Sequence, residues 1–168
     1  MYKYETHLHT KEGSACSSAP AADMARAHKA AGYDGIFVTD HFFNANTAVP
    51  RDLPWEDRVD RYFLGYEHAK EVGDEIGLKV WFGCEFTVYN ADFLIYGMEK
   101  DWMKANEELL MHTDERVLFS KLRNELDCFI VHAHPFRHAS YIHHISLYPY
   151  DVDAVETINA SHDPRKLY

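Results

Sequence analysis

The sequence predicts a single α/β domain built from βα units around a parallel sheet. Short apolar runs alternate with helical stretches along all 168 residues, the pattern of strands joined by crossover helices. The chain is 46% hydrophobic and 14% aromatic, which is enough for one core that buries most of its apolar surface. No repeat, low-complexity tract or linker divides the chain. We therefore expect one domain over residues 1–168.

Six apolar runs and three helical stretches supply these units. The first helix is expected to open at Ser18 and Pro20 and to close at Gly32, which follows the preference for early proline and late glycine. The last has leucines at helical spacing and Thr113 as its expected cap. The loop at 41–55 is long enough to be functional. The strands are expected at residues 2–9, 34–40, 79–86, 92–97, 128–134 and 153–158, and the helices at 18–31, 56–76 and 114–126.

Charge and composition exclude several classes of partner. The net charge is −10 and the pI is about 5.6, so a broad basic surface for a phosphate backbone is absent and nucleic acid is a disfavoured partner. The sequence has neither a signal peptide, which would predict export, nor an apolar run long enough to span a membrane. We therefore expect a soluble, cytoplasmic protein. Three widely spaced cysteines fit neither a disulfide framework nor a CxxC zinc motif and are expected to be reduced thiols.

The polar residues that end the apolar strands are the most informative feature. Because the carboxyl ends of parallel strands meet at one edge of a sheet, the loops there converge on one mouth. Five of the predicted strands therefore deliver metal-binding side chains, or an amide, to a single rim. These residues are His7, His9, Asp40, His41, Glu85, His132, His134 and Asn159.

The spacing of the histidines indicates shared metal ligands. In an extended HxH, His7 and His9 point to the same face about 7 Å apart along the chain, close enough to share one ion. The HAH at 132–134 repeats the arrangement. A carboxylate such as Glu85 between the two pairs could bridge two cations, the geometry that polarises a phosphoryl oxygen and makes hydroxide from water. Imidazole and carboxylate ligands suit zinc, manganese or iron.

Several of these residues also have a simpler interpretation. A single buried histidine is usually a core residue, but the proline after His134 ends the strand at the rim and favours ligation there. His132, on the same face but deeper, is either a supporting or a packing residue. At the end of the second strand His41 is expected to face the metal, while Asp40 points the other way and orients it. Arg137 is either a surface charge or a grip for a substrate phosphate.

Taken together, the motifs resemble the PHP family, the polymerase and histidinol phosphatase superfamily of metal-dependent phosphoesterases. The matching pieces occur in the family's order and span almost the whole chain. A single HxH is a weak signal, whereas the ordered set is specific. The pieces are THLHT at 6–10, VTDH at 38–41, GCEF at 83–86, HAHPF at 132–136 and ETIN at 156–159.

The resemblance implies a distorted, TIM-like (β/α)7 barrel with one to three divalent ions, of which we expect two. It implies supporting roles for Asp40 and Asn159. Asp92 stands where many members place a further metal-binding histidine and could bind through oxygen. Many members also carry a His or Asp ligand shortly after HxH, where this sequence reads KEGSACS. Ala15 and its neighbours cannot supply this ligand, unless Glu12 takes its place. The implied ligands are His7, His9, His41, Glu85 and His134.

The C-terminus departs from the family pattern. Members close with a further βα unit and an Asp-x-His motif, whereas this sequence ends at NASHDPRKLY, and its SHD at 161–163 lies too close to ETIN to be that motif. We therefore expect a barrel that is incomplete at its C-terminus, either as a piece of a longer chain or as a natural short form. Such an open edge favours self-association and weak activity.

The expected function is hydrolysis of a small phosphorylated substrate by metal-activated water. The first alternative is a PHP-like relic that binds a metal or a partner without catalysis. The second is a nuclease or proofreading domain, which the acidic charge disfavours.

Overall fold

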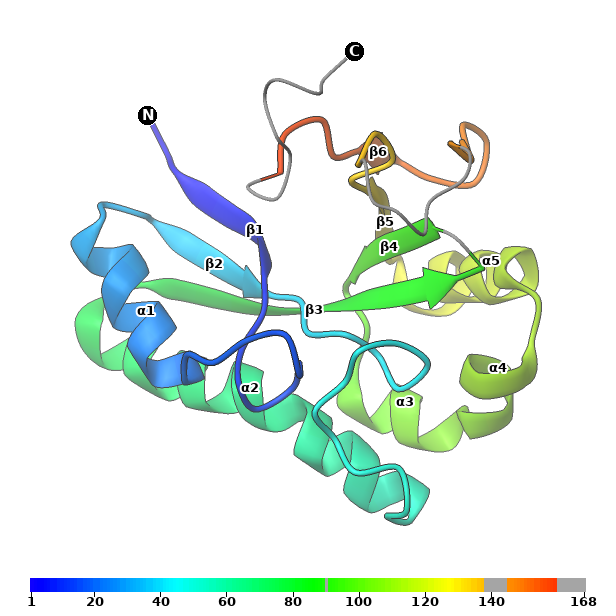
Figure 1. The fold of residues 1–168 in the computed structure, drawn as a ribbon, viewed down its shortest axis with the longest axis horizontal. Helices are drawn as coiled ribbons and strands as arrows, with labels where there is room; N and C mark the ends of the chain where they lie inside the picture. The colour runs from blue at the N-terminus through cyan, green and yellow to red at the C-terminus, as the bar shows by residue number, and fades with distance from the viewer. Residues whose placement is uncertain (90, 138–144, 160–168) are drawn as a thin grey trace.

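The computed structural model describes residues 1–89, 91–137 and 145–159, and it has an α/β architecture with one curled sheet of six strands (Figure 1). The strands lie in the sheet in the order in which they occur in the sequence. All six predicted strands are confirmed, although the last is only two residues long. Their bounds are β1 Tyr4–Leu8, β2 Gly35–Val38, β3 Lys79–Val88, β4 Ala91–Tyr96, β5 Phe129–Ala133 and β6 Ala154–Val155.

The prediction of a parallel sheet is wrong for one strand. β1, β2 and β3 are parallel, as are β5 and β6, but β4 is antiparallel to both of its neighbours. The connection between Val88 and Ala91 is too short for a crossover helix, so β3 and β4 form a hairpin. The consequence matters for the site, because the beginning of β4 then lies at the same rim as the ends of the other strands.

In the described part of the chain, five helices accompany the sheet (Figure 1). α1 (Ala21–Ala30) and α2 (Trp55–Ile76) pack on the first three strands through an aliphatic cluster. A second, aromatic cluster joins α2 to the later helices and strands. α3 (Lys100–Ala105) and α4 (Glu107–His112) were not predicted, since six residues are too few to show a clear helical period.

The helix ends agree with the predicted ones to within a few residues. Gly32 has a positive φ of 79° just beyond α1, as its position predicts. α5 (Glu115–Leu126) begins one residue later than expected, and its cap is Asp114. The Asp114 carboxylate accepts a hydrogen bond of 2.9 Å from the Arg116 N–H, so the prediction of a Thr113 cap is wrong. Aspartate and threonine are both good caps, and the sequence places them side by side.

Two glycines allow the chain to close tightly around Asp40 at the end of β2. A Cβ at Gly65 of α2 would lie 2.3 Å from Thr10 Oγ1 and 2.7 Å from Asp40 Oδ2, and one at Gly13 would lie 2.4 Å from Asp40 Oδ2. A side chain at either position would therefore displace Asp40. The Tyr62 hydroxyl, also from α2, donates to the Asp40 carbonyl at 2.5 Å. The long helix thus holds the end of β2 in place.

Among the described residues, no helix combines the length and the apolar character needed to cross a lipid bilayer. The three cysteines are unpaired, as predicted. Cys84 and Cys128 are buried, whereas Cys16 is exposed. Cys16 is therefore the most accessible thiol of the three.

Candidate metal centre

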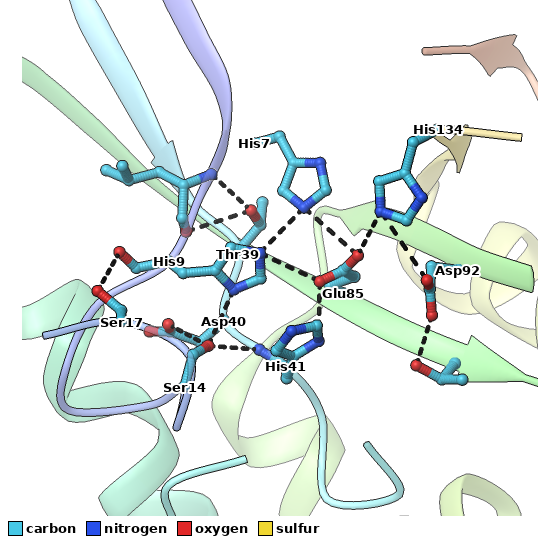
Figure 2. A network of polar contacts seen from close by, with 12 residues as sticks. His7, His9, Ser14, Ser17, Thr39, Asp40, His41, Glu85, Asp92 and His134 are labelled. Atoms are coloured by element: carbon cyan, nitrogen blue, oxygen red, sulfur yellow. Dashed lines mark hydrogen bonds and ion pairs between the residues drawn. The ribbon is translucent and has the colours of Figure 1, made fainter. Parts of the chain in front are cut away.

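Six of the predicted ligands converge at the rim of the sheet (Figure 2). Four of them stand at or just beyond the ends of β1, β2 and β5, and the other two lie on the β3–β4 hairpin. Asp92 reaches this rim because β4 runs in the opposite direction to its neighbours. All six line one cavity of about 720 Å³. They are His7, His9, His41, Glu85, Asp92 and His134.

Glu85 is at the centre of this cluster. Its Oε1 atom lies 3.0 Å from His134 Nε2 and 3.4 Å from His7 Nε2. Its Oε2 atom lies 2.8 Å from His41 Nδ1 and 3.2 Å from His9 Nε2. The carboxylate is 1% exposed. A buried carboxylate whose two oxygens face different pairs of imidazoles has the arrangement that bridges two ions.

The electrostatics of the metal-free cluster favour a charged pair. Burial opposes the ionisation of Glu85, but the imidazoles around it, first His134 through its hydrogen bond, hold the pKa of Glu85 far below its usual range. Burial also opposes a charge on His7, but hydrogen bonds to Glu156 and Glu85 raise the pKa of His7 to about 10. At neutral pH the cluster therefore holds a carboxylate and a protonated imidazole. A metal-binding histidine must be neutral, so an ion would displace this proton.

Two buried atoms of the cluster, Glu85 Oε2 and His41 Nδ1, make no hydrogen bond within the described part of the chain. They are 2.8 Å apart, but they are not oriented to form a hydrogen bond with each other. Buried polar atoms are nearly always paired, so these two indicate a partner that is not among the described residues, such as a bound ion. Imidazole and carboxylate donors at this spacing suit a divalent ion of the zinc, manganese or iron type. The residues present thus fit a metal centre.

Asp40 lies behind the cluster and contacts it through Ser14 (Figure 2). It accepts hydrogen bonds from the Thr10 N–H at 2.6 Å and from the Ser14 hydroxyl at 2.7 Å. The Ser14 hydroxyl oxygen in turn lies 2.9 Å from His9 Nδ1 and accepts from the His41 N–H at 2.9 Å. Because Ser14 donates to Asp40, it accepts from Nδ1–H of His9, which leaves Nε2 of that ring as the ligand atom. Asp40 therefore orients His9 through Ser14.

Glu156, just beyond β6, was given no role by sequence reasoning. Both of its oxygens lie 3.2 Å from His7 Nδ1, and Oε2 accepts from the His134 N–H at 2.9 Å. Asn159 donates to its Oε1 at 3.0 Å. Since Nε2 of His7 faces Glu85, a carboxylate on the opposite nitrogen fixes the tautomer and strengthens the imidazole as a ligand. The ETIN motif thus ties the last strand to the first through Glu156.

Glu156→Gln is expected to lower the affinity for zinc by about tenfold to hundredfold, because carboxylates that orient metal-binding histidines have effects of this size. The affinity for zinc is measured by competition with a chromophoric chelator. Glu5→Gln is the matched control, since Glu5 lines the same cavity but, among the described residues, accepts a hydrogen bond from the His7 backbone N–H alone, at 3.0 Å. An equal loss in both variants would show a general charge effect rather than orientation of the His7 ring.

Asp92 and Arg137 complete the cavity wall. Asp92 Oδ2 lies 3.8 Å from His134 Nε2, while Oδ1 accepts from the Thr87 hydroxyl at 2.6 Å. This second contact holds one carboxylate oxygen toward the cluster. Arg137 follows His134 in a turn, in which the Arg137 backbone N–H donates a hydrogen bond of 2.9 Å to the His134 carbonyl. Arg137 thus lines the cavity that the six ligands share.

His132, expected to be either a supporting or a packing residue, does not line the cavity that the six ligands share. Its ring stacks on Phe93 at 5.2 Å between centroids and meets the edge of Tyr148 at 5.5 Å. Strand alternation predicts the same face for His132 and His134. However, His134 follows the strand and has a φ of 30°, which breaks the alternation and brings its side chain to the rim. The contacts support the packing alternative for His132.

Glu12, named as the conditional replacement for the missing ligand, does not line the cavity. Glu12 accepts a hydrogen bond of 3.0 Å from the backbone at the start of α1, away from the cluster. Cys16 lies at the site instead, with its thiol within 4.8 Å of ring nitrogens of His9 and His41. Sequence reasoning missed it because Cys16 belongs to no cysteine motif. The signal was its position in KEGSACS, shortly after HxH.

Comparison with known proteins supports the fold. No family model and no curated protein matches the sequence. The crystal structure of a two-domain protein from Bacteroides vulgatus, containing a predicted PHP-like metal-dependent phosphoesterase, is similar with a TM-score of 0.64 and 15% identity. The match covers 88% of this chain and 39% of that one, so this chain spans about two fifths of the neighbour's length.

At this identity the likeness concerns the fold alone, and the curled six-stranded sheet is consistent with a partial TIM-like barrel. Within the described residues the sheet is open, and β1 and β6 are its edge strands. Side chains nevertheless connect these edges through His7 and Glu156. The SHD at 161–163 lies outside the described residues.

Proposed function

We propose that this protein is a metal-dependent phosphoesterase that hydrolyses a small phosphate ester with metal-activated water. The observation that carries the proposal is the placement of Glu85, whose two carboxylate oxygens face two separate pairs of histidines inside one cavity. The structural neighbour supports it through the fold. The order of the PHP-like motifs supports it through the sequence.

When bound, two divalent ions would polarise the phosphoryl oxygens and acidify a water molecule. The side chains of this protein have three tasks around them. Glu85 would hold the ions together with the histidines, which would bind them as neutral ligands, and Asp40 and Glu156 keep two of those rings oriented. Arg137 offers a guanidinium to the phosphate oxygens from the cavity wall. No side-chain nucleophile is needed for this chemistry.

The cavity limits the size of the substrate. A volume of about 720 Å³ is within the range of small-molecule sites. The net charge of −10 weakens attraction to long polyanions. We therefore favour a small phosphorylated compound over a nucleic acid, with zinc, manganese or iron as the ion.

Turnover of p-nitrophenyl phosphate and of bis-p-nitrophenyl phosphate tests the proposal. The protein is purified without chelator, its metal content is determined, and both esters are assayed before and after chelation and again after zinc or manganese is restored. We expect release of p-nitrophenol that chelation removes and metal restores. Glu85→Gln, purified in parallel, controls for contaminating phosphatases.

Two results would contradict the proposal. Metal bound in stoichiometric amounts without turnover of either ester would favour the noncatalytic metal-binding alternative. Turnover that survives in Glu85→Gln would come from a contaminant or from another site.

A further inference from the structure

Cys16 is held at the rim by the loop that follows β1. The residues on either side of it are fixed by the backbone: Ala15 N–H donates to the Asn46 carbonyl at 2.9 Å, and Ser17 N–H to the Ser14 carbonyl at 3.2 Å. The Ser17 hydroxyl also donates to the His9 carbonyl, at 3.2 Å. These bonds place the thiol within 4.8 Å of ring nitrogens of His9 and His41. The position of the thiol is therefore built into the loop.

A second observation points to a ligand at the same place. Glu85 Oε2 is buried and, within the described residues, makes no hydrogen bond, and the same is true of His41 Nδ1. Glu85 Oε2 lies 2.8 Å from this nitrogen and 3.2 Å from His9 Nε2. The rings of His9 and His41 are 4.4 Å apart between centroids. Ring nitrogens of His9 and His41 thus lie close both to the Cys16 thiol and to Glu85 Oε2.

The two oxygens of Glu85 face different ligands, although His7 Nε2 and His9 Nε2 are themselves only 3.1 Å apart. His9 Nδ1 is taken by Ser14 and His7 Nδ1 by Glu156, so each ring offers only Nε2 to an ion. His7 lies with His134 and Asp92 on the Oε1 side of Glu85, which makes a set of nitrogen and oxygen donors. The Oε2 side has the same number of donors, but one of them is sulfur.

We propose that His9, Cys16, His41 and Oε2 of Glu85 form a four-ligand site for a thiophilic divalent ion of the zinc class, and that the two sides of the centre differ in metal preference. Thiolate ligands favour zinc over hard ions such as magnesium, while a nitrogen and oxygen set also accepts manganese. A set of four protein donors is typical of tetrahedral zinc. The inference rests on the metal centre of the proposed function, not on hydrolysis.

Cobalt(II) substitution tests this site without an assay of activity. A thiolate bound to cobalt gives an intense sulfur-to-metal charge-transfer band, which nitrogen and oxygen ligands do not give. We expect this band when the metal-free protein is titrated with cobalt(II), and we expect zinc to abolish it. Cys16→Ser should lose the band and bind zinc at this side at least about tenfold more weakly, while the Oε1 side still binds an ion.

Matched variants separate the thiols. Cys84→Ser and Cys128→Ser should keep the band, because these cysteines are buried elsewhere. Cys16→His should bind zinc without giving the band, since it restores a ligand but not sulfur. Absence of the band in the wild-type protein, or its persistence in Cys16→Ser, would overturn the inference. A band that depends on Cys16 in a protein that hydrolyses neither ester would support the inference and contradict the proposed function.

Discussion

Replacing Glu85 by glutamine is expected to remove metal binding and hydrolysis together while the fold persists. Glutamine has nearly the same shape as glutamate, so the packing around this buried position changes little. It lacks the negative charge that would bridge the two ions. Since even carboxylates that only orient a ligand change affinity by about tenfold to hundredfold, we expect a loss of more than about a hundredfold for the bridging residue.

Metal content after dialysis and turnover of p-nitrophenyl phosphate measure this prediction, and circular dichroism checks the fold. Glu5→Gln again serves as the control, because it removes a carboxylate from the same cavity without touching an imidazole ring. Retention of full metal content and wild-type turnover by Glu85→Gln would refute the bridging role. Loss of the native circular dichroism spectrum would instead show that Glu85 supports the fold.

The sequence was sufficient to locate the strands and the rim, because both follow from local patterns. An apolar run that ends in HxH or in Glu85 marks a strand and its polar end without knowledge of the neighbours. The direction of β4 was less accessible. It depends on a hairpin between Val88 and Ala91, where the absence of a helical stretch was the only signal. That direction nevertheless decides the position of Asp92, which the family resemblance supplied.

The residues that sequence reasoning missed act through contacts between distant segments. Ser14 matters because a loop returns its hydroxyl to Asp40 and His9. Glu156 matters because the segment after β6 lies against β1, 149 residues away in sequence. Such contacts have no period or spacing in the sequence.

His132 shows where a local rule stops deciding between two alternatives. Strand alternation put it beside His134, but the alternation ends where His134 takes a positive φ. The backbone N–H of His134 is held in that conformation by Glu156 at 2.9 Å. Local pattern therefore failed at the point where the functional site distorts the strand.

The affinity for zinc is expected to rise about a hundredfold between about pH 6 and about pH 8, because binding at His7 displaces one proton. The pKa of His7 in the metal-free protein is raised to about 10, against burial, by hydrogen bonds to Glu156 and Glu85. Over that interval the ring is protonated in the metal-free protein and neutral in the complex. Each pH unit then changes the affinity by a factor of about ten for each proton released.

The raised pKa of His7 has the opposite effect on the stability of the metal-free protein, which falls as the pH rises. A raised histidine pKa stabilises the fold fully below about pH 6.5, the usual value for an unfolded chain, and this contribution is lost as the pH rises toward about 10. Alkaline conditions should therefore weaken the metal-free protein and strengthen the complex. Urea unfolding at two pH values measures the free energy of unfolding, once with chelator and once with zinc. The comparison shows whether stability falls with pH in the metal-free protein and rises in the complex.

Calorimetric titration with zinc in two buffers of different ionisation enthalpy counts the protons directly. The Cys16→Ser variant is used so that the thiol contributes none, and we expect about one proton released per ion at His7 near neutral pH. Glu156→Gln should release fewer protons at alkaline pH, because it removes one of the two carboxylates that hold the proton on His7. An affinity independent of pH, with no proton released, would show that His7 is already neutral before the ion binds and that the charged pair of His7 and Glu85 does not form.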